Sequence, residues 1–335
     1  MTTVDMRFFY GRFRGSNPIR ATWRIVAVDE VNRRFGILTF PVAPASAVES
    51  EWRWAEELGF DHAWLPDSFS NSGIAAFEVW TLLAALAKTT SRIRMGTLVT
   101  TIVPRHPLLL ATMALTVDHL SGGRIEVGIG AGDQPTESDV FGLPRWPPAE
   151  RVARLEEQLG LLDELLRGNE VSRAGMHYSV RGAHLASPVQ QPRPPLLVSA
   201  EGPRALRLAA RYADAWSTLA GQWVAGGTGG RASEQQALAA TKAKVEELER
   251  LRVEFGRGAG SIRRIVLAYR QPVVPLSSLD AFDHFVGSYA EVGIDEFVFY
   301  WPPVLNLKDR RAVSREQRVV VERIAAARLS SSSPA

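Results

Sequence analysis

Short apolar runs rich in β-branched and aromatic residues alternate with segments of helical period from residue 35 onward. Such alternation is typical of parallel strands joined by crossover helices. The predicted strands are Phe35–Phe40, His62–Leu65, Ile93–Thr100, Ile125–Gly130, Leu196–Ser199, Ala215–Thr218, Ile265–Tyr269 and Glu296–Tyr300. The predicted helices are Ala47–Leu58, Phe77–Thr89, Leu108–Leu120, Pro148–Arg167, Pro203–Arg211, Ser233–Phe255, Ser278–Val292 and Arg311–Arg328.

The number of strand–helix units decides between two α/β architectures. A doubly wound sheet usually stops near about six strands, whereas eight units in about 300 residues match a closed barrel. We therefore predict a (β/α)8 TIM barrel over residues 35–329. Three long connections, 168–195, 219–231 and 302–308, could form a lid, and a plain linker is the equal alternative for the glycine-rich second one.

Composition agrees with a globular protein, since 46% of the residues are hydrophobic and 22% are charged. No apolar run reaches the roughly 20 residues of a membrane helix, and no secretory signal is readable at the start, so we expect a cytoplasmic protein without a membrane segment. The chain has no cysteine. Disulfides, thiolate metal sites and a cysteine nucleophile are thereby excluded.

Positive charge is concentrated at the start of the chain. Residues 1–34 contain seven arginines and three acidic residues, Asp5, Asp29 and Glu30, which gives a net charge of +4. Because the whole chain has a net charge of +3, residues 35–335 have a net charge of −1. A barrel without net positive charge is not expected to bind nucleic acid. We expect residues 1–34 to form a basic arm, either a contact for a partner or membrane surface or a disordered extension, and residues 330–335 to form a disordered tail.

Residues directly after each strand of such a barrel face a shared mouth, so they are the first candidates for chemistry. Asp67 follows the second strand and could bind a cofactor ring or tune a proton, or it could cap its own turn. Arg105 and His106 precede a helix that begins near Pro107. Arg105 could pair with a phosphate or carboxylate, and His106 is either an acid–base group or a surface residue at the helix start.

Two glycine-containing strand ends are candidates for cofactor contact. Along Gly128–Asp133, missing side chains would let a flat ring approach the backbone, or the glycines serve a barrel corner. The spacing is not that of a dinucleotide-binding fingerprint. At Ser199–Gly202 a strand end meets a helix start, where backbone N–H groups and the helix dipole can bind phosphate if Glu201 points away. The alternative is a simple Gly-Pro helix start.

The usual hydrolytic signatures are missing from the sequence. There is no G-x-S-x-G motif, and the six histidines show no metal-binding spacing, so we expect no metal site. Among the aromatic residues near strand ends, Tyr300 and Trp301 are predicted to wall an apolar pocket for a ring system.

Several segments taken together resemble the bacterial luciferase-like superfamily. They are GFDHAWLPDSF, GTLVTTIVPRHP, DHLSGGRIEVGIGAGD, RVARLEEQLGLLDELLRG and GPRALRLAARYADAW. The match runs from about Phe35 to Trp216, and a weaker one covers YAEVGIDEFVFYWPP. The resemblance implies a (β/α)8 barrel that binds FMN or its deazaflavin relative, coenzyme F420, and acts as a homodimer on a small-molecule substrate.

The resemblance also implies which positions surround the cofactor. Asp67 would face the ring, with Leu98–Val99 as a non-prolyl cis peptide behind it and Thr100 alongside. The residues that would border the ring are Gly130, Ala131, Gly132 and Asp133. The residues that would hold the phosphate are Ser199, Ala200, Glu201 and Gly202. For the proton that accompanies the reaction, the catalytic candidates are Asp67, His106 and Asp133.

Two branches of the superfamily differ in chemistry. In the FMN branch, flavin reduced by a partner reductase reacts with oxygen and oxygenates the substrate, whereas in the deazaflavin branch a hydride moves directly between substrate and ring. The run Gly128–Asp133 resembles deazaflavin-dependent sugar-phosphate dehydrogenases, which favours the second branch. Ser68 stands where those enzymes have an active-site histidine, so their substrate is not implied. A flavin-binding protein without catalysis is a further alternative.

Overall fold

The computed structural model describes residues 33–42, 44–67, 69, 76–132, 135–220, 233–269, 271, 273–302 and 314–328. The predicted basic arm lies outside these ranges except for Arg33 and Arg34, and the predicted tail lies outside them entirely. Most of the predicted lid connections 219–231 and 302–308 also lies outside them, as do Ser68 and Asp133.

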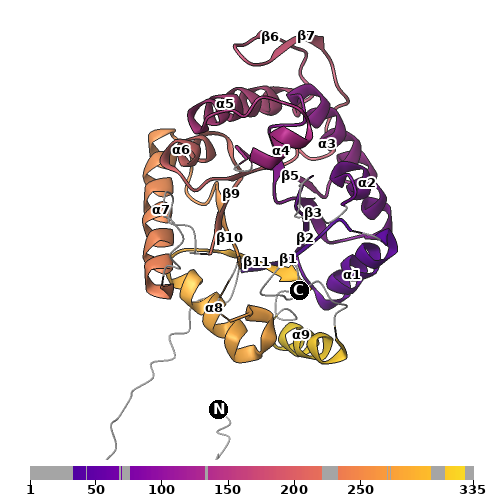
Figure 1. The fold of residues 1–335 in the computed structure, drawn as a ribbon, viewed down its shortest axis with the longest axis vertical. Coiled ribbons are helices and arrows are strands. Elements are labelled where there is room, and N and C mark those ends of the chain that lie inside the picture. Colours follow the sequence, from indigo (N-terminus) through magenta and orange to yellow (C-terminus); the bar gives the residue numbers. More distant parts are fainter. Residues whose placement is uncertain are drawn as a thin grey trace, which may run out of the picture. The chain divides into compact units, whose positions relative to one another are not determined.

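Parallel strands form one closed sheet. Its order is β3-β2-β1-β11-β10-β9-β8-β5-β4, and an additional β3–β5 pairing closes the circle. Because β3 and β4 both pair with β5, they occupy one position, and the barrel has the predicted eight positions (Figure 1). The barrel strands are β1 Arg34–Thr39, β2 His62–Leu65, β3 Arg94–Thr97, β4 Thr100–Thr101, β5 Ile125–Gly130, β8 Leu196–Ser199, β9 Ala215–Leu219, β10 Arg263–Leu267 and β11 Glu296–Trp301.

Helices surround the barrel (Figure 1). They are α1 Ala45–Leu58, α2 Val79–Thr89, α3 Pro107–Ser121, α4 Pro135–Val140, α5 Pro148–Leu165, α6 Pro203–Tyr212, α7 Glu234–Glu254, α8 Leu279–Glu291 and α9 Arg315–Arg328, with a 3₁₀ turn at Pro275–Ser277. Among the helices that the structure describes, only the six-residue α4 has no counterpart in the prediction, because fewer than two turns are too short to show a period. Among the described helices, none has both the length and the apolar character needed to span a bilayer.

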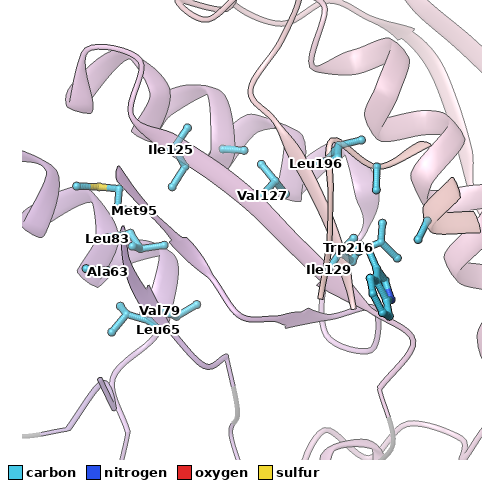
Figure 2. Packing of buried hydrophobic residues seen from close by; sticks show 14 of the residues in the cluster. Ala63, Leu65, Val79, Leu83, Met95, Ile125, Val127, Ile129, Leu196 and Trp216 are labelled. Carbon is cyan, nitrogen blue, oxygen red and sulfur yellow. The ribbon is translucent and has the colours of Figure 1, made fainter. Parts of the chain in front are cut away.

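Side chains along each strand alternate between two apolar layers, as the two-residue period of β-structure requires. Residues such as Val127 and Phe297 face the helices and belong to the larger layer, part of which Figure 2 shows. Residues such as Leu38, Trp64 and Val298 face the lumen and form a second cluster. The lumen is therefore filled by side chains, as expected of a (β/α)8 barrel.

Two glycines let β3 and β5 approach each other closely. A Cβ atom added to Gly128 would lie 1.8 Å from the carbonyl oxygen of Thr97, and one added to Gly96 would lie 2.3 Å from that of Glu126. The single strand predicted over Ile93–Thr100 is in fact divided after Thr97, where the chain crosses to β4. Glycine in this part of the barrel is thus required by backbone contact alone.

The connection 168–195 is not a lid over the barrel mouth. It contains an antiparallel hairpin of β6 Val171–Ala174 and β7 Ser179–Ala183, which lies outside the ring of helices (Figure 1). The Glu157 carboxylate of α5 holds it by accepting hydrogen bonds from the backbone N–H groups of His177 at 2.9 Å and Tyr178 at 2.8 Å. The short polar strands explain why the pattern predicts a loop here.

Charged side chains close the amino end of the lumen. Glu126 and Glu296, each 1% exposed at the side chain, share the guanidinium of Arg263, and Glu126 also accepts from Arg94 at 2.6 Å. The fully buried ring of His62 lies between the two carboxylates, with Nε2 3.2 Å from Glu126 and Nδ1 3.1 Å from Glu296. We call these five residues the amino-end cluster.

Candidate functional site

The carboxyl ends of neighbouring strands bring the predicted cofactor residues together. Thr101 of β4 is in register with Gly130 of β5, Gly130 with Ser199 of β8, and Ser199 with Ser217 of β9. Gly130, Ser199 and Ser217 share the lumen face with Leu197 and Ala215, because alternate residues of a strand point the same way. Segments far apart in the sequence thus form one continuous wall.

The bond between Leu98 and Val99 is cis, which confirms the prediction for this segment. Both side chains contact the lumen cluster. A Cβ atom on Gly130 would lie 3.0 Å from Cγ2 of Val99. The absence of a side chain at Gly130 therefore makes space for the side chain of Val99. Gly132 has φ +69°, a left-handed conformation that favours glycine. Ala131 and Gly132 are half-buried beside this wall.

Asp67 does not face the lumen, contrary to the prediction. Its carboxylate, 2% exposed, forms a bidentate ion pair with Arg105 and accepts a hydrogen bond from the Thr100 hydroxyl. Thr100 in turn accepts from Trp80 Nε1 of α2 at 3.1 Å. Because these partners lie toward α2, Asp67 and the Thr100 side chain belong to the layer between strands and helices, and only the backbone of Thr100 borders the wall.

Arg105 binds a second carboxylate, that of Glu78, at 2.5 Å. Glu78 precedes α2 and caps it, accepting from the backbone N–H groups of Trp80 at 3.2 Å and Thr81 at 2.7 Å. Burial raises the pKa of Asp67, although Arg105 opposes the rise. Burial acts in the same direction on Glu78, but the N–H of Thr81 and the guanidinium of Arg105 outweigh it and lower the pKa.

The start of α6 is open, as the predicted anion site requires. Gly202 precedes the helix with φ −95°, no side chain caps the helix, and a Cβ atom on Gly202 would meet nothing within 4 Å. The first N–H groups of a helix have no partner within it, so they are available to an anion beside Gly202. Ser199 is half-buried next to this turn, and Ala200 is buried.

The Glu201 carboxylate points away from the start of α6, which is the condition that the sequence set for an anion site there. Its Oε1 accepts from the Thr218 hydroxyl at 2.9 Å and from the N–H of Leu219 at 2.8 Å, and its Oε2 forms an ion pair with Lys244 of α7. The carboxylate is thereby directed toward β9 and α7. Thr218 stands at a predicted strand end and was recognisable as a candidate, whereas nothing in the sequence singles out Lys244.

His106 is placed at a helix start and not among the site residues. Its Nδ1 accepts a hydrogen bond from the N–H of Leu108 at 3.2 Å, which caps α3, and its exposed ring lies edge-on to Tyr178. This is the helix-start role left open by the sequence. Among the predicted catalytic residues, Asp133 lies outside the described part of the chain.

The two aromatic residues predicted to wall a pocket point in opposite directions. Tyr300 stacks on Phe40 in the lumen cluster with ring centroids 5.8 Å apart. Trp301 is fully buried on the helix side, where it packs on Trp54 and donates its Nε1–H to Glu51 of α1. The prediction is therefore wrong for Trp301, since neighbouring residues of a strand face opposite sides.

These features fit a planar cofactor with a phosphate tail. Val99 and Gly130 present an apolar, side-chain-poor surface, and Gly202 leaves open space at a helix start. Ser217 is 2% exposed, and its hydroxyl has no hydrogen-bond partner within the described residues. A buried hydroxyl on the same wall as Ser199 is a ready contact for a polar group of a ligand.

Comparison with known proteins agrees with this fold. The family profile described as luciferase-like monooxygenase matches residues 34–269. An "F420-dependent glucose-6-phosphate dehydrogenase" of Microbacterium testaceum (strain StLB037) is 36% identical over 173 residues, which are 50% of this chain and 51% of that protein. A "4-hydroxyprotoasukamycin monooxygenase" of Streptomyces nodosus subsp. asukaensis is 32% identical over 189 residues, 53% of this chain and 50% of that protein.

The structural comparison extends over more of the barrel. The coenzyme F420 dependent tetrahydromethanopterin reductase from Methanopyrus kandleri superposes with a TM-score of 0.68 at 18% identity, covering 87% of this chain and 97% of that one. At this identity the likeness shows the fold. The chain spans about half the length of the curated relatives named above. The family profile covers most of the barrel, and the chain therefore belongs to the luciferase-like monooxygenase family.

Proposed function

We propose that this protein is an oxidoreductase that binds coenzyme F420 at the carboxyl end of its barrel and transfers a hydride between the deazaflavin ring and a small-molecule substrate. The observation that carries the proposal is the continuous wall of Val99, Gly130 and Ser199, which ends at the open helix start beside Gly202. The names of curated relatives, several of them F420-dependent dehydrogenases, support this cofactor.

Each part of the wall has a distinct task in this proposal. The bound deazaflavin supplies the hydride chemistry. Val99 and Gly130 provide the surface against which a flat ring packs, and Ser199 with the N–H groups of α6 binds the phosphate. Lys244 keeps the Glu201 carboxylate away from that phosphate by ion pairing. Asp133 remains the candidate for handling the proton.

FMN-dependent oxygenation is the second candidate function. The Streptomyces relative is named as a monooxygenase, and FMN shares with the deazaflavin coenzyme a tricyclic ring and a phosphate. In that case a flavin reductase would be a partner, because the reaction requires reduced FMN. A protein that binds the cofactor without turnover is the third outcome.

We further propose a cytoplasmic homodimer. Helix α3 leaves Leu109 50% exposed and Leu120 37% exposed, beside a groove of about 320 Å³ lined by Leu115 and Leu185. Burying exposed apolar surface of this kind against a second protomer stabilises a dimer. Light scattering coupled to gel filtration tests the proposal: a monomer for the wild type, or a dimer unchanged by Leu109→Lys, would contradict it.

A parallel fluorescence titration with F420, oxidised FMN and reduced FMN tests the cofactor. We expect tight binding of F420, and preference for FMN would support the second function. Gly202→Glu places a carboxylate beside the proposed phosphate, and we expect it to weaken binding by about 100-fold or more. Gly258→Glu is the matched control, since a Cβ there also meets nothing within 4 Å. Unchanged affinity in Gly202→Glu would refute the phosphate site.

A further inference from the structure

Arg105 is almost completely buried, yet it binds two carboxylates from different segments. Its side chain is 5% exposed, and its guanidinium pairs with Asp67 at the end of β2 and with Glu78 at the start of α2. Phe69 covers the guanidinium at 5.3 Å from its ring centroid. Arg105 itself comes from the connection between β4 and α3. One side chain therefore joins three consecutive units of the barrel.

Through Asp67, the ion pairs of Arg105 also hold the segment that carries Val99. Strand β4 has only two residues, which pair with Ile129 and Gly130 of β5. On its other side, β2 contacts this segment through the N–H of Leu98, which donates to the carbonyl of Leu65 at 2.9 Å. The Thr100 hydroxyl, bound between Asp67 and Trp80, supplies a further attachment on the helix side.

The charge of Arg105 is needed for this arrangement. A buried carboxylate without a cation takes up a proton, because burial disfavours the ionised form. Glu78 would not replace the guanidinium, since it is itself an acid. A planar fork also fixes the orientation of Asp67, which a lysine ammonium does not do.

We propose that Arg105 is a positioning residue of the cofactor site, which holds Val99 and Thr100 in place behind the cofactor ring through Asp67. The proposal rests on the proposed function, because it requires that the ring bind at this wall. Arg105 does not touch the cofactor. It acts by fixing the carboxylate that ties β4 to β2 and to α2.

Arg193 is a matched control at the opposite end of the barrel. Its side chain is 6% exposed and also binds two carboxylates, Asp163 at 2.7 Å and Asp214 at 2.6 Å. Arg193→Gln thus also removes a buried arginine that pairs with two carboxylates, here 29% and 39% exposed, without touching the cofactor wall. Any loss of cofactor affinity that follows from general destabilisation should be seen in both variants.

The experiment measures the dissociation constants of F420 and FMN by fluorescence, between about pH 6 and about pH 8, for folded variants checked by circular dichroism. We expect Arg105→Gln to weaken binding about tenfold or more relative to the wild type, Arg105→Lys to weaken it less, and Arg193→Gln to leave it unchanged. The dissociation constant of Arg105→Gln divided by that of the wild type should increase with pH. Asp67 would bind a proton at the lower pH and become an unpaired anion at the higher pH, facing Glu78 and the Thr100 hydroxyl.

The double variant Asp67→Asn with Arg105→Gln lacks the buried Asp67 carboxylate and keeps that of Glu78, which is 35% exposed and accepts hydrogen bonds from N–H groups at the start of α2. The ratio of its dissociation constant to that of the wild type should therefore change much less with pH than the ratio for Arg105→Gln. Equal affinity of Arg105→Gln and wild type, or equal losses in Arg105→Gln and Arg193→Gln, would overturn the proposal. If Arg105→Gln does not fold, wild-type affinity in Arg105→Lys would overturn it. If the wild type binds neither F420 nor FMN, the proposed function fails and takes this proposal with it.

Discussion

The two ends of the barrel both bury arginines among carboxylates, but they leave different groups free. In the amino-end cluster, Glu126 accepts from His62, Arg94 and Arg263, and Glu296 shares the same arginine. At the carboxyl end, Arg105 pairs with Asp67 and Glu78 between the strands and α2. The wall on the lumen side presents small residues and the start of α6.

This difference separates stability from binding. The amino end satisfies its charges with one another, which fixes strands that are distant in sequence. The carboxyl end leaves the Ser217 hydroxyl and the first N–H groups of α6 for a ligand. A crevice of about 820 Å³ opens at the amino end, lined by Arg94, Glu126 and Arg263 among others. Size alone therefore does not identify the functional end. Unpartnered buried polar atoms occur at both ends, since His62 Nδ1 also lacks a hydrogen bond within the described residues, so the open helix start beside Gly202 is what distinguishes the carboxyl end.

The largest effect on stability is expected from Glu126→Gln. The amide has no negative charge, so Arg94 would lose its carboxylate partner, and Arg263 and His62 would keep Glu296 alone. The free energy of unfolding should fall by about 3–5 kcal/mol. Urea unfolding measures the change. Glu164→Gln is the control, because Glu164 pairs with Arg173 at the surface with about 40% of each side chain exposed. Its effect should stay below about 1 kcal/mol. Equal effects of the two variants would show that the amino-end cluster contributes nothing special.

Acid should remove the same contribution from the wild type. His62, Arg263 and Arg94 outweigh burial and hold the pKa of Glu126 well below its usual value. Folded Glu126 therefore binds a proton less readily than unfolded Glu126, and its stabilisation is present above the unfolded pKa of about 4.3 and is lost as pH falls through the lower folded value. The stability difference between wild type and Glu126→Gln should narrow as pH falls from about 5 toward about 2. A constant difference would contradict the assignment.

A smaller loss is expected where β3 meets β5. In Gly128→Ala the new methyl group would have to occupy the position 1.8 Å from the Thr97 carbonyl oxygen, so the strands must separate. We expect a loss of about 1–3 kcal/mol, the usual range for overpacking a close contact. Thermal unfolding monitored by circular dichroism measures it, and a wild-type midpoint would show that the strands can adjust without cost.

Sequence patterns predict the features that depend on one segment at a time. The strand ends at Gly130 and Ser199 and the helix start at Pro203 follow from local periodicity, and the barrel follows from the number of units. The resemblance adds the cis bond at Leu98–Val99. The facing direction of Trp301 was also accessible, because it must oppose that of Tyr300.

Contacts between distant segments could not be predicted in this way. Residues 126 and 263 meet only because β5 and β10 curve around one lumen, and no local pattern marks their pairing. Arg105 was recognised as a partner for a carboxylate, but its sharing between Asp67 and Glu78 depends on how three barrel units pack. The hairpin of β6 and β7 was not predicted because its strands are short and largely polar.

The smallest change in stability is expected from Gly202→Ser at the carboxyl end. The position has φ −95°, which any residue adopts, and open space around its Cβ direction. A serine hydroxyl can accept from a free N–H of α6, so unfolding free energy should change by no more than about 0.5 kcal/mol, in the stabilising direction. The same hydroxyl would compete with the cofactor phosphate for these N–H groups, so F420 affinity should fall while stability does not. Gly128→Ala is expected to do the opposite, with a larger effect on stability than on F420 affinity. If Gly202→Ser instead lowers stability and leaves affinity intact, the start of α6 belongs with the amino end of the barrel as a structural element, and the distinction between the two ends fails there.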